Sequence, residues 1–198
     1  MAIINNNQSV GAIPATNTFG NVRTNYTLIQ NLQHQIDQLI GRADLGFADY
    51  NDTSGSFNIV EDTWTDMPNN GLGVYSNKQY LPTGVTDVMD TSTGYLDFSE
   101  LTLGSELLIR NQFKVVPNTN NCLLEVRYLL GQGAGEYPLL FWSERLDSGS
   151  GQDYDRVLSF PIYMGDLNTQ GGVGRLQVKL STNGTITNAG SYISITLK

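Results

Sequence analysis

The chain has 198 residues and a formal net charge of −8, and only 15% of its residues are charged. A chain of this length can bury a core of its own and suits one main domain with appendages. Binding to a phosphate backbone needs clustered Lys and Arg, which the acidic balance argues against. No apolar run approaches the roughly 18–20 residues of a membrane span, and residues 1–14 lack the pattern of a signal peptide. We therefore expect neither a nucleic acid nor a membrane as partner.

Residues 1–23, "MAIINNNQSVGAIPATNTFGNVR", mix small, amide and isolated apolar residues without a sustained period. Pro14 and the neighbouring glycines argue against regular structure. A disordered leader and an extended arm that becomes ordered on another surface both fit this composition. In the second interpretation, the isolated hydrophobic residues are docking anchors: Ile3, Ile4, Val10, Ile13 and Phe19.

Residues 24–41, "TNYTLIQNLQHQIDQLIG", form the only clear helical pattern. The three-four-three spacing of its apolar residues matches the a and d positions of a coiled coil: Ile29, Leu32, Ile36 and Leu39. The alternative is a helix that lies on its own domain. A seam of barely two heptads is too short to hold chains together alone, so it needs help from the following domain. We favour self-association, with a trimer slightly ahead of a dimer.

A polar linker is expected at 42–55, and 56–198 reads as a succession of short strands and turns. The clearest strand, "ELLIRNQFKVV", alternates so that one face holds Leu107, Ile109, Phe113 and Val115. About eight or nine such strands without intervening helices predict a mainly β fold, an antiparallel β-sandwich. Jelly-roll and immunoglobulin-like topologies both fit, and the jelly roll is favoured.

Two local features extend this reading of the strands. Asn183–Gly184, between "GRLQVKLS" and the last strand, is typical of a tight hairpin turn. Cys122 shares a face of "CLLEVRYLL" with Leu124 and Val126, which predicts a buried, unreactive thiol.

No catalytic constellation emerges from the sequence. The lone histidine, His34, falls in the helix, far along the chain from the strands. A catalytic triad or a His-based zinc site is therefore not expected in the strand region. The acidic loops, with Asp87 and Asp90 in one and Asp147, Asp153 and Asp155 in the other, lack the spacing of a known calcium loop. We therefore expect no enzyme, no cofactor and no metal site.

Aromatic residues in strand and turn regions have two interpretations. They pack in the core or between subunits, which is favoured, or they stack on sugar rings of a glycan. The residues concerned are Trp64, Tyr75, Tyr80, Tyr95, Trp142, Tyr154 and Tyr163.

Two segments carry a resemblance to a known group. The pattern F-x-x-L-x-x-G-x-x-x-x-I-R runs from Phe98 to Arg110, and Y-x-G-D-x-N-T runs from Tyr163 to Thr169. With the strands around them, residues 95–198 resemble the β-domain of tailed-bacteriophage virion surface proteins. The resemblance implies a jelly-roll domain, usually trimeric, on a capsid decoration protein, head fibre or tail fibre. Such a protein is made in the cytoplasm of the host bacterium and resides on the virion surface.

The resemblance gives the N-terminal segments a role. It implies a non-enzymatic structural protein that decorates the capsid as a homotrimer, with residues 1–23 docked on another virion protein. The docking partner would be the major capsid protein or a fibre-attachment protein. The alternative is a tail fibre whose sandwich recognises host glycan.

Overall fold

The computed structural model describes residues 24–33, 35, 44–147 and 151–198. The chain divides into two compact units, Met1–Arg42 and Ala43–Lys198. In the first unit, residues 24–33 and 35 are α-helical, within the range that the sequence predicts. The second unit is built from strands, with one short helix, α2 (Leu167–Gln170), and one 3₁₀ turn, η2 (Gly133–Gly135).

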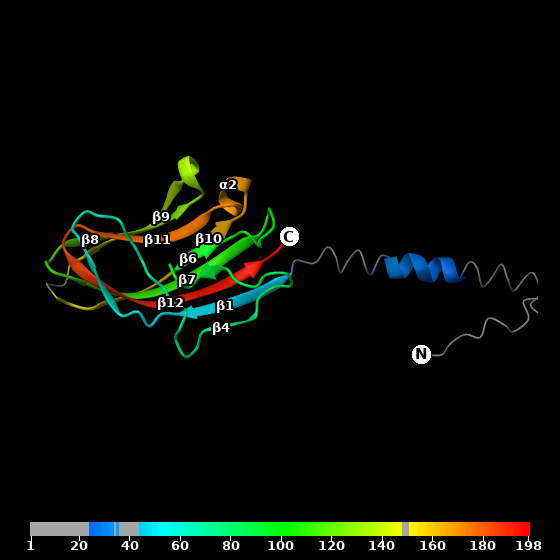
Figure 1. The fold of residues 1–198 in the computed structure, drawn as a ribbon, viewed down its shortest axis with the longest axis horizontal. Coiled ribbons are helices and arrows are strands. Elements are labelled where there is room, and N and C mark those ends of the chain that lie inside the picture. Colours follow the sequence, from blue (N-terminus) through cyan, green and yellow to red (C-terminus); the bar gives the residue numbers. More distant parts are fainter. Residues whose placement is uncertain (1–23, 34, 36–43, 148–150) are drawn as a thin grey trace, which may run out of the picture. The chain divides into compact units, whose positions relative to one another are not determined.

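The second unit is a sandwich of two sheets, which form an upper and a lower layer in Figure 1. The first sheet runs in the order β10 (Tyr154–Tyr163), β7 (Glu106–Pro117), β12 (Gly184–Thr196), β1 (Leu45–Asn51) and β4 (Asn77–Tyr80), with β2 (Ser56–Ile59) also paired to β12. The second sheet runs in the order β5 (Met89–Asp90), β6 (Tyr95–Asp97), β11 (Val173–Leu180), β8 (Cys122–Leu130) and β9 (Tyr137–Leu146), with β3 (Thr65–Asp66) paired to β11.

The order of the strands is that of a jelly roll. Of the connections that join β7 through β12 in sequence, β8–β9 stays within one sheet, whereas the others cross between sheets. The central orders β1-β12-β7-β10 and β6-β11-β8-β9 follow from these crossings. All pairings between these strands are antiparallel, so the prediction of an antiparallel jelly-roll sandwich is confirmed.

The linker expected at 42–55 is wrong for most of its length. Strand β1 occupies it and pairs with β12 from Leu45 opposite Thr196 to Asn51 opposite Gly190. Ala48 and Tyr50 of β1 are buried in the core. An alanine and a tyrosine give a weaker apolar signal than Leu, Ile or Val, and the surrounding Asp and Asn residues conceal the alternation.

The hairpin expected at Asn183–Gly184 is also wrong, because β11 and β12 belong to different sheets. Gly184 serves a close approach of backbones: a Cβ at this position would lie 2.7 Å from the Val116 carbonyl oxygen of β7. Asn183 joins neighbouring loops, since its side-chain oxygen accepts from the Glu61 amide at 3.0 Å. The dipeptide therefore marks a crossing between the sheets.

The core contains the inward positions of both sheets, including the predicted faces of β7 and β8. One polar cluster interrupts it: Asn111 donates to the Tyr128 hydroxyl at 2.9 Å and accepts from the Ser191 hydroxyl at 2.8 Å. Cys122 is buried as predicted, and burial raises the pKa of its thiol.

The two segments that carry the family resemblance lie against each other. The Gly104 amide donates to the Met164 carbonyl and the Met164 amide donates to the Ser105 carbonyl, both at 2.8 Å. Phe98 and Leu101 are buried, and the Asp166 side chain caps α2 by accepting from the Thr169 amide at 2.8 Å. Both segments thus belong to one end of the jelly roll.

Candidate functional site

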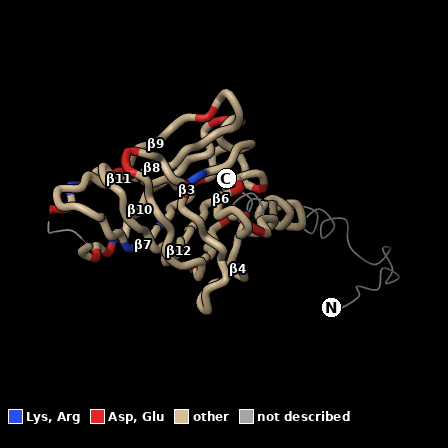
Figure 2. Tube along the Cα trace, turned by 60° about the vertical axis from the view of Figure 1, so that its left-hand side comes forward, with Lys and Arg blue, Asp and Glu red and all other residues tan. Residues whose placement is uncertain are grey.

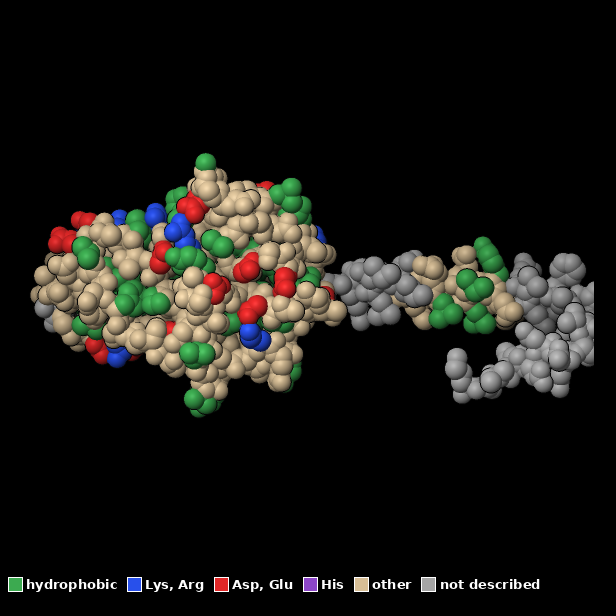
Figure 3. Space-filling view, in the orientation of Figure 1, with side chains coloured by type: hydrophobic (Ala, Val, Ile, Leu, Met, Phe, Trp, Pro, Cys, Tyr) green, Lys and Arg blue, Asp and Glu red, His purple; other side chains and the backbone are tan. Residues whose placement is uncertain are grey.

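The helix in the first unit exposes its apolar side chains. Tyr26, Leu28, Ile29 and Leu32 are each more than half exposed, and hydrophobic side chains cover much of the part of the helix drawn in colour in Figure 3. Isolated amphipathic helices are marginal in water, and their apolar face needs a partner. Ile29 and Leu32, two of the four predicted seam residues, are therefore available for self-association.

The remaining predicted site residues lie outside the described part of the chain. They are the seam residues Ile36 and Leu39, the anchors Ile3, Ile4, Val10, Ile13 and Phe19, and the histidine His34. Their roles stay predictions.

The outer face of the first sheet carries a second group of exposed apolar side chains. Alternate residues of β7 and β10 point away from the core. The apolar members of this face, with the residues on β1 and β4 beside them, are Leu45, Phe47, Tyr80, Leu108, Val157, Pro161 and Tyr163. We call these residues the apolar patch; most of them were not singled out by the sequence analysis.

A row of stacked side chains crosses this face. Tyr80 lies on Phe47 with ring centroids 5.0 Å apart, and Phe47 lies on Tyr192 at 5.6 Å. The Arg110 guanidinium is 5.7 Å from the centroid of the Tyr192 ring. The row therefore contains one residue from each of four strands, β4, β1, β12 and β7, and these contacts hold the side chains in place on the face.

A polar hollow of about 70 Å³ lies beside this row. It forms where β12 bulges between Asn188 and Gly190. Gly190 has a φ of +123°, and because it has no side chain the Tyr50 carbonyl can approach it closely. Asp49 and Arg110 line the hollow. Asp49 accepts from the Asn51 amide group at 2.7 Å, and neither Asp49 nor Arg110 forms an ion pair within the described residues.

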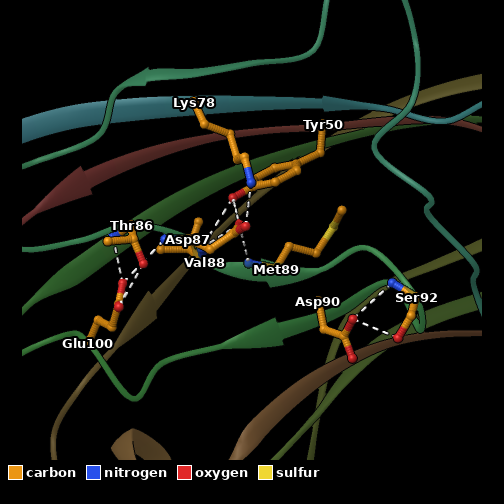
Figure 4. A network of polar contacts seen from close by, with 9 residues as sticks. All are labelled: Tyr50, Lys78, Thr86, Asp87, Val88, Met89, Asp90, Ser92 and Glu100. Atoms are coloured by element: carbon orange, nitrogen blue, oxygen red, sulfur yellow. Dashed lines mark hydrogen bonds and ion pairs between the residues drawn. The ribbon is translucent and has the colours of Figure 1, made fainter.

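A network of polar contacts joins β1 to the loop before β5 (Figure 4). The Asp87 carboxylate accepts hydrogen bonds from the Tyr50 hydroxyl, from the Lys78 ammonium at 2.5 Å and from the Val88 amide at 3.0 Å. Glu100 reinforces the same loop by accepting from the Thr86 hydroxyl at 2.7 Å. A hollow of about 310 Å³ beside the network is lined in part by Tyr50 and Lys78.

The electrostatics of this network suit a structural role. Burial, followed by the hydrogen bond to Asp87, raises the pKa of Tyr50 far above its ordinary value. Burial opposes ionisation of Asp87, but the hydrogen bonds from Lys78, Tyr50 and the Met89 amide outweigh it and lower the pKa of the carboxyl. At neutral pH the phenol stays neutral and the carboxylate stays fully occupied, so the cluster has no free base.

The outer face of the second sheet is charged, and several of its charges form ion pairs or cation–π contacts within the chain. The Trp64 ring lies close to two cations, the Arg127 guanidinium at 3.9 Å from its centroid and the Lys179 ammonium at 4.9 Å. Lys179 also pairs with Glu125 at 2.6 Å. The chain as a whole has sparse charge, with acidic positions more numerous than basic ones along the tube in Figure 2.

The acidic loops show no converging carboxylates. Asp153 pairs with the Lys114 ammonium at 2.7 Å, and Asp90 accepts from the Ser92 amide and hydroxyl. Across the described ranges, no group of three or more His, Cys, Asp or Glu side chains is arranged to hold a metal ion. Within the same ranges, no helix has the length and apolarity to cross a membrane.

The aromatic residues singled out from the sequence separate into two groups. Trp64 and Tyr95 are half-buried on the second sheet, where the Tyr95 hydroxyl donates to Asp66 at 2.6 Å. The more exposed group includes Tyr75, Tyr80 and Tyr163. These do not converge on one platform: Tyr75 belongs to a loop, whereas Tyr80 and Tyr163 lie at opposite edges of the first sheet.

Comparisons with known proteins give similarity at the level of structure only. No family model matches the sequence, and no curated protein matches it. Solved structures that match include Eiger TNF from S. frugiperda (12% identity, TM-score 0.37), covering 79% of this chain and 93% of that one. A second is infectious bursal disease virus, Gx strain (10% identity, TM-score 0.42), covering 79% of this chain and 32% of that one.

A third similar structure is the PRD1 vertex protein P5, at 18% identity and a TM-score of 0.32, covering 79% of this chain and 98% of that one. Identities and scores this low carry no argument about what the present chain does. Its function has to be inferred from its own residues.

Proposed function

We propose that this chain is a non-enzymatic structural protein of a bacteriophage virion surface, which decorates the capsid as a homotrimer anchored by its N-terminal region. The observation that carries the proposal is the exposed apolar stripe of the helix, with Ile29 and Leu32 at coiled-coil spacing. A stripe of this kind needs a partner helix, and a second and third copy of the chain supply one. The resemblance of residues 95–198 to virion surface domains gives the setting.

The polar clusters of the sandwich support a structural role. Asp87, the carboxylate with the most hydrogen bonds in Figure 4, is occupied by Tyr50, Lys78 and backbone amides. A general base must have a free lone pair near its substrate and a pKa close to the working pH. The lone pairs of Asp87 are occupied and the pKa of its carboxyl is lowered, so this residue does not meet these requirements. We assign it the structural role of holding the loop before β5 in place.

The proposal assigns attachment to residues 1–23. Their isolated hydrophobic residues would each bury an anchor against a neighbouring virion protein, such as the major capsid protein or a fibre-attachment protein. Each anchor contributes about 1.5–3 kcal/mol before the entropy of ordering is subtracted. Three arms on one trimer would make a modest affinity per arm add up to near-permanent attachment.

Deletion of residues 2–20 tests the attachment. We expect a folded trimer that no longer joins particles, measured by mixing purified protein with particles that lack it and sedimenting them. A matched control replaces Asn5, Asn6 and Asn7 with serine, which keeps all anchors and should co-sediment like the full chain. If the deleted form co-sediments equally well, attachment lies in the helix or the sandwich.

A receptor-binding fibre that recognises host glycan is the second candidate. The hollow of about 310 Å³ favours it, because polar side chains of Ser76, Asn77 and Lys78 line the hollow and the exposed Tyr75 adjoins them in sequence. A glycan array separates the two candidates: reproducible binding that is lost in Tyr75→Ala supports the fibre, and absence of binding leaves decoration.

A further inference from the structure

The apolar patch of the first sheet contains several side chains that are at least half exposed. Five of its residues, from strands that are far apart in the sequence, are between 50% and 70% exposed: Leu45, Tyr80, Leu108, Val157 and Tyr163. Single exposed apolar residues are normal on a protein surface, but several on one face of a sheet are typical of an interaction site. The register gives two apolar groups on this face, Leu108 with Pro161 on β7 and β10 and Phe47 with Tyr80 on β1 and β4, and Ser194 of β12 lies between them.

Two charged residues on this face, Arg110 and Asp49, form no ion pair within the described residues. Arg110 and Asp49 lie on either side of Tyr192, in direct register with it on β7 and β1. Two strand spacings, roughly 10 Å, therefore separate their backbones. The face presents an unpaired cation near its β7 side and an unpaired carboxylate near its β1 side. It is thus complementary to a second copy of itself.

The position of the patch in the chain indicates which partner covers it. The patch begins at Leu45, the first residue of β1, directly after the segment that follows the helix. If the helices of several copies associate, the first residues of their β1 strands are held close together. Each copy then meets its neighbour at a high effective concentration beside this patch. The short helical seam in turn needs such a second contact, because about two heptads do not hold chains together alone.

We infer that the outer face of the first sheet is the surface through which the sandwich domains of neighbouring copies pack, with Leu108 in its apolar half and Arg110 of one copy paired with Asp49 of the next. This inference rests on the proposed assembly and deepens it. The helix selects the partner, and the sheet face supplies the contact that the helix lacks. In a ring of copies, the β1 side of one sheet face meets the β7 side of the next.

The test compares two exposed leucines in the full-length chain. Leu108 lies on the first sheet and is 50% exposed, whereas Leu140 lies on β9 of the second sheet and is 54% exposed. We expect Leu108→Asp to weaken assembly on the order of 100-fold, because a carboxylate would be buried without a partner, and Leu140→Asp to leave it within about twofold. Sedimentation equilibrium over a range of concentrations measures both. Thermal unfolding checks that each variant folds.

A charge exchange tests the pairing between copies. Arg110→Asp and Asp49→Arg should each weaken assembly on the order of tenfold, and the double variant should return to within about threefold of the original. Recovery in the double variant cannot result from damage to the fold. Failure of the exchange to restore assembly overturns the pairing.

Other outcomes separate this inference from the proposed function. If Leu108→Asp assembles like the original chain while Ile29→Asp with Leu32→Asp does not, the sheet face is not the contact and the helical assembly stands. If Leu140→Asp is the damaging variant, the contact lies on the second sheet. If the unmodified chain is monomeric at all concentrations, both the inference and the proposed trimer are wrong.

Discussion

The two outer faces of the sandwich differ in how many of their charged groups have partners and in how many of their apolar side chains are exposed. On the second sheet, Trp64 is covered by Arg127 and Lys179, and Lys179 is neutralised by Glu125. On the first sheet, Arg110 has no carboxylate partner within the described residues, and apolar side chains such as Leu108 stand exposed beside it. The second face thus has more of its charges paired within the described residues than the first.

This difference shows why the number of charges on a surface is a poor guide to its role. Both faces carry arginines and carboxylates, but the second arranges more of them into ion pairs and cation–π contacts, whereas the first has the Lys114–Asp153 pair and the contact of Arg110 with Tyr192. A face whose groups are satisfied internally gains little from a partner, since association would remove water from groups that are already paired. A face with unpaired groups and exposed apolar residues gains on both accounts.

The largest expected effect is on the stability of the second face. Trp64→Ala should lower the free energy of unfolding by about 2 kcal/mol, because it removes the ring that contacts Arg127 and Lys179. Trp64→Phe, which keeps a ring at the site, should recover about half of this loss. Denaturant titration measures the change, and the mass of the assembly should stay the same. If Trp64→Ala changed the mass of the assembly and left the free energy of unfolding unchanged, the second face would be the assembly surface.

A smaller effect is expected at the edge where the two sheets meet. Glu144 of β9 pairs with Arg156 of β10 through two contacts of 2.6 Å, and this pairing lowers the pKa of Glu144 below its ordinary value. A carboxyl whose folded pKa is lowered stabilises the fold above its unfolded pKa, and the contribution disappears as pH falls through the folded pKa. Glu144→Gln should therefore cost about 0.5–1 kcal/mol at pH 7, after allowance for solvent screening.

The same variant should cost progressively less as the pH is lowered, because the contribution of the pair disappears as the carboxyl becomes protonated in the folded state as well. Glu61→Gln is the matched control, because Glu61 is exposed and its side chain has no ion pair in the described part of the chain. Denaturant titrations at neutral and at acidic pH measure the difference. Equal losses for Glu144→Gln at both would show that the pair does not supply the stability.

The fold was predictable where apolar alternation is strong. In β7 and β8 large aliphatic and aromatic residues occupy nearly every second position, so period, strand type and buried face all follow from the sequence. Strand β1 was missed because its buried positions hold Ala48 and Tyr50 among polar neighbours. The crossing at Gly184 was misread as a hairpin, since the sequence does not show that this glycine is required by the backbone of β7.

The candidate site was less predictable than the fold. The helical stripe is local, so its spacing is visible in a single segment. The apolar patch is not visible in this way, because Leu45, Leu108 and Val157 belong to three strands that only pairing places in one sheet. In the sequence, Leu108 stands alone between Glu106 and Arg110 on a face that reads as polar. Only the order of the strands turns scattered residues into a surface.

The smallest expected effect concerns the acidic loops, whose carboxylates are satisfied within the chain like those of the second face. Asp153 is held by Lys114, and hydrogen bonds from Ser92 lower the pKa of Asp90. A calcium ion would have to displace these contacts and would still find too few oxygens, because it takes about six to eight. Addition of a chelator, or of calcium, should therefore shift the melting temperature by less than about 1 °C. A rise with calcium that the chelator reverses would contradict this, and Asp147→Asn with Asp153→Asn would then locate the site.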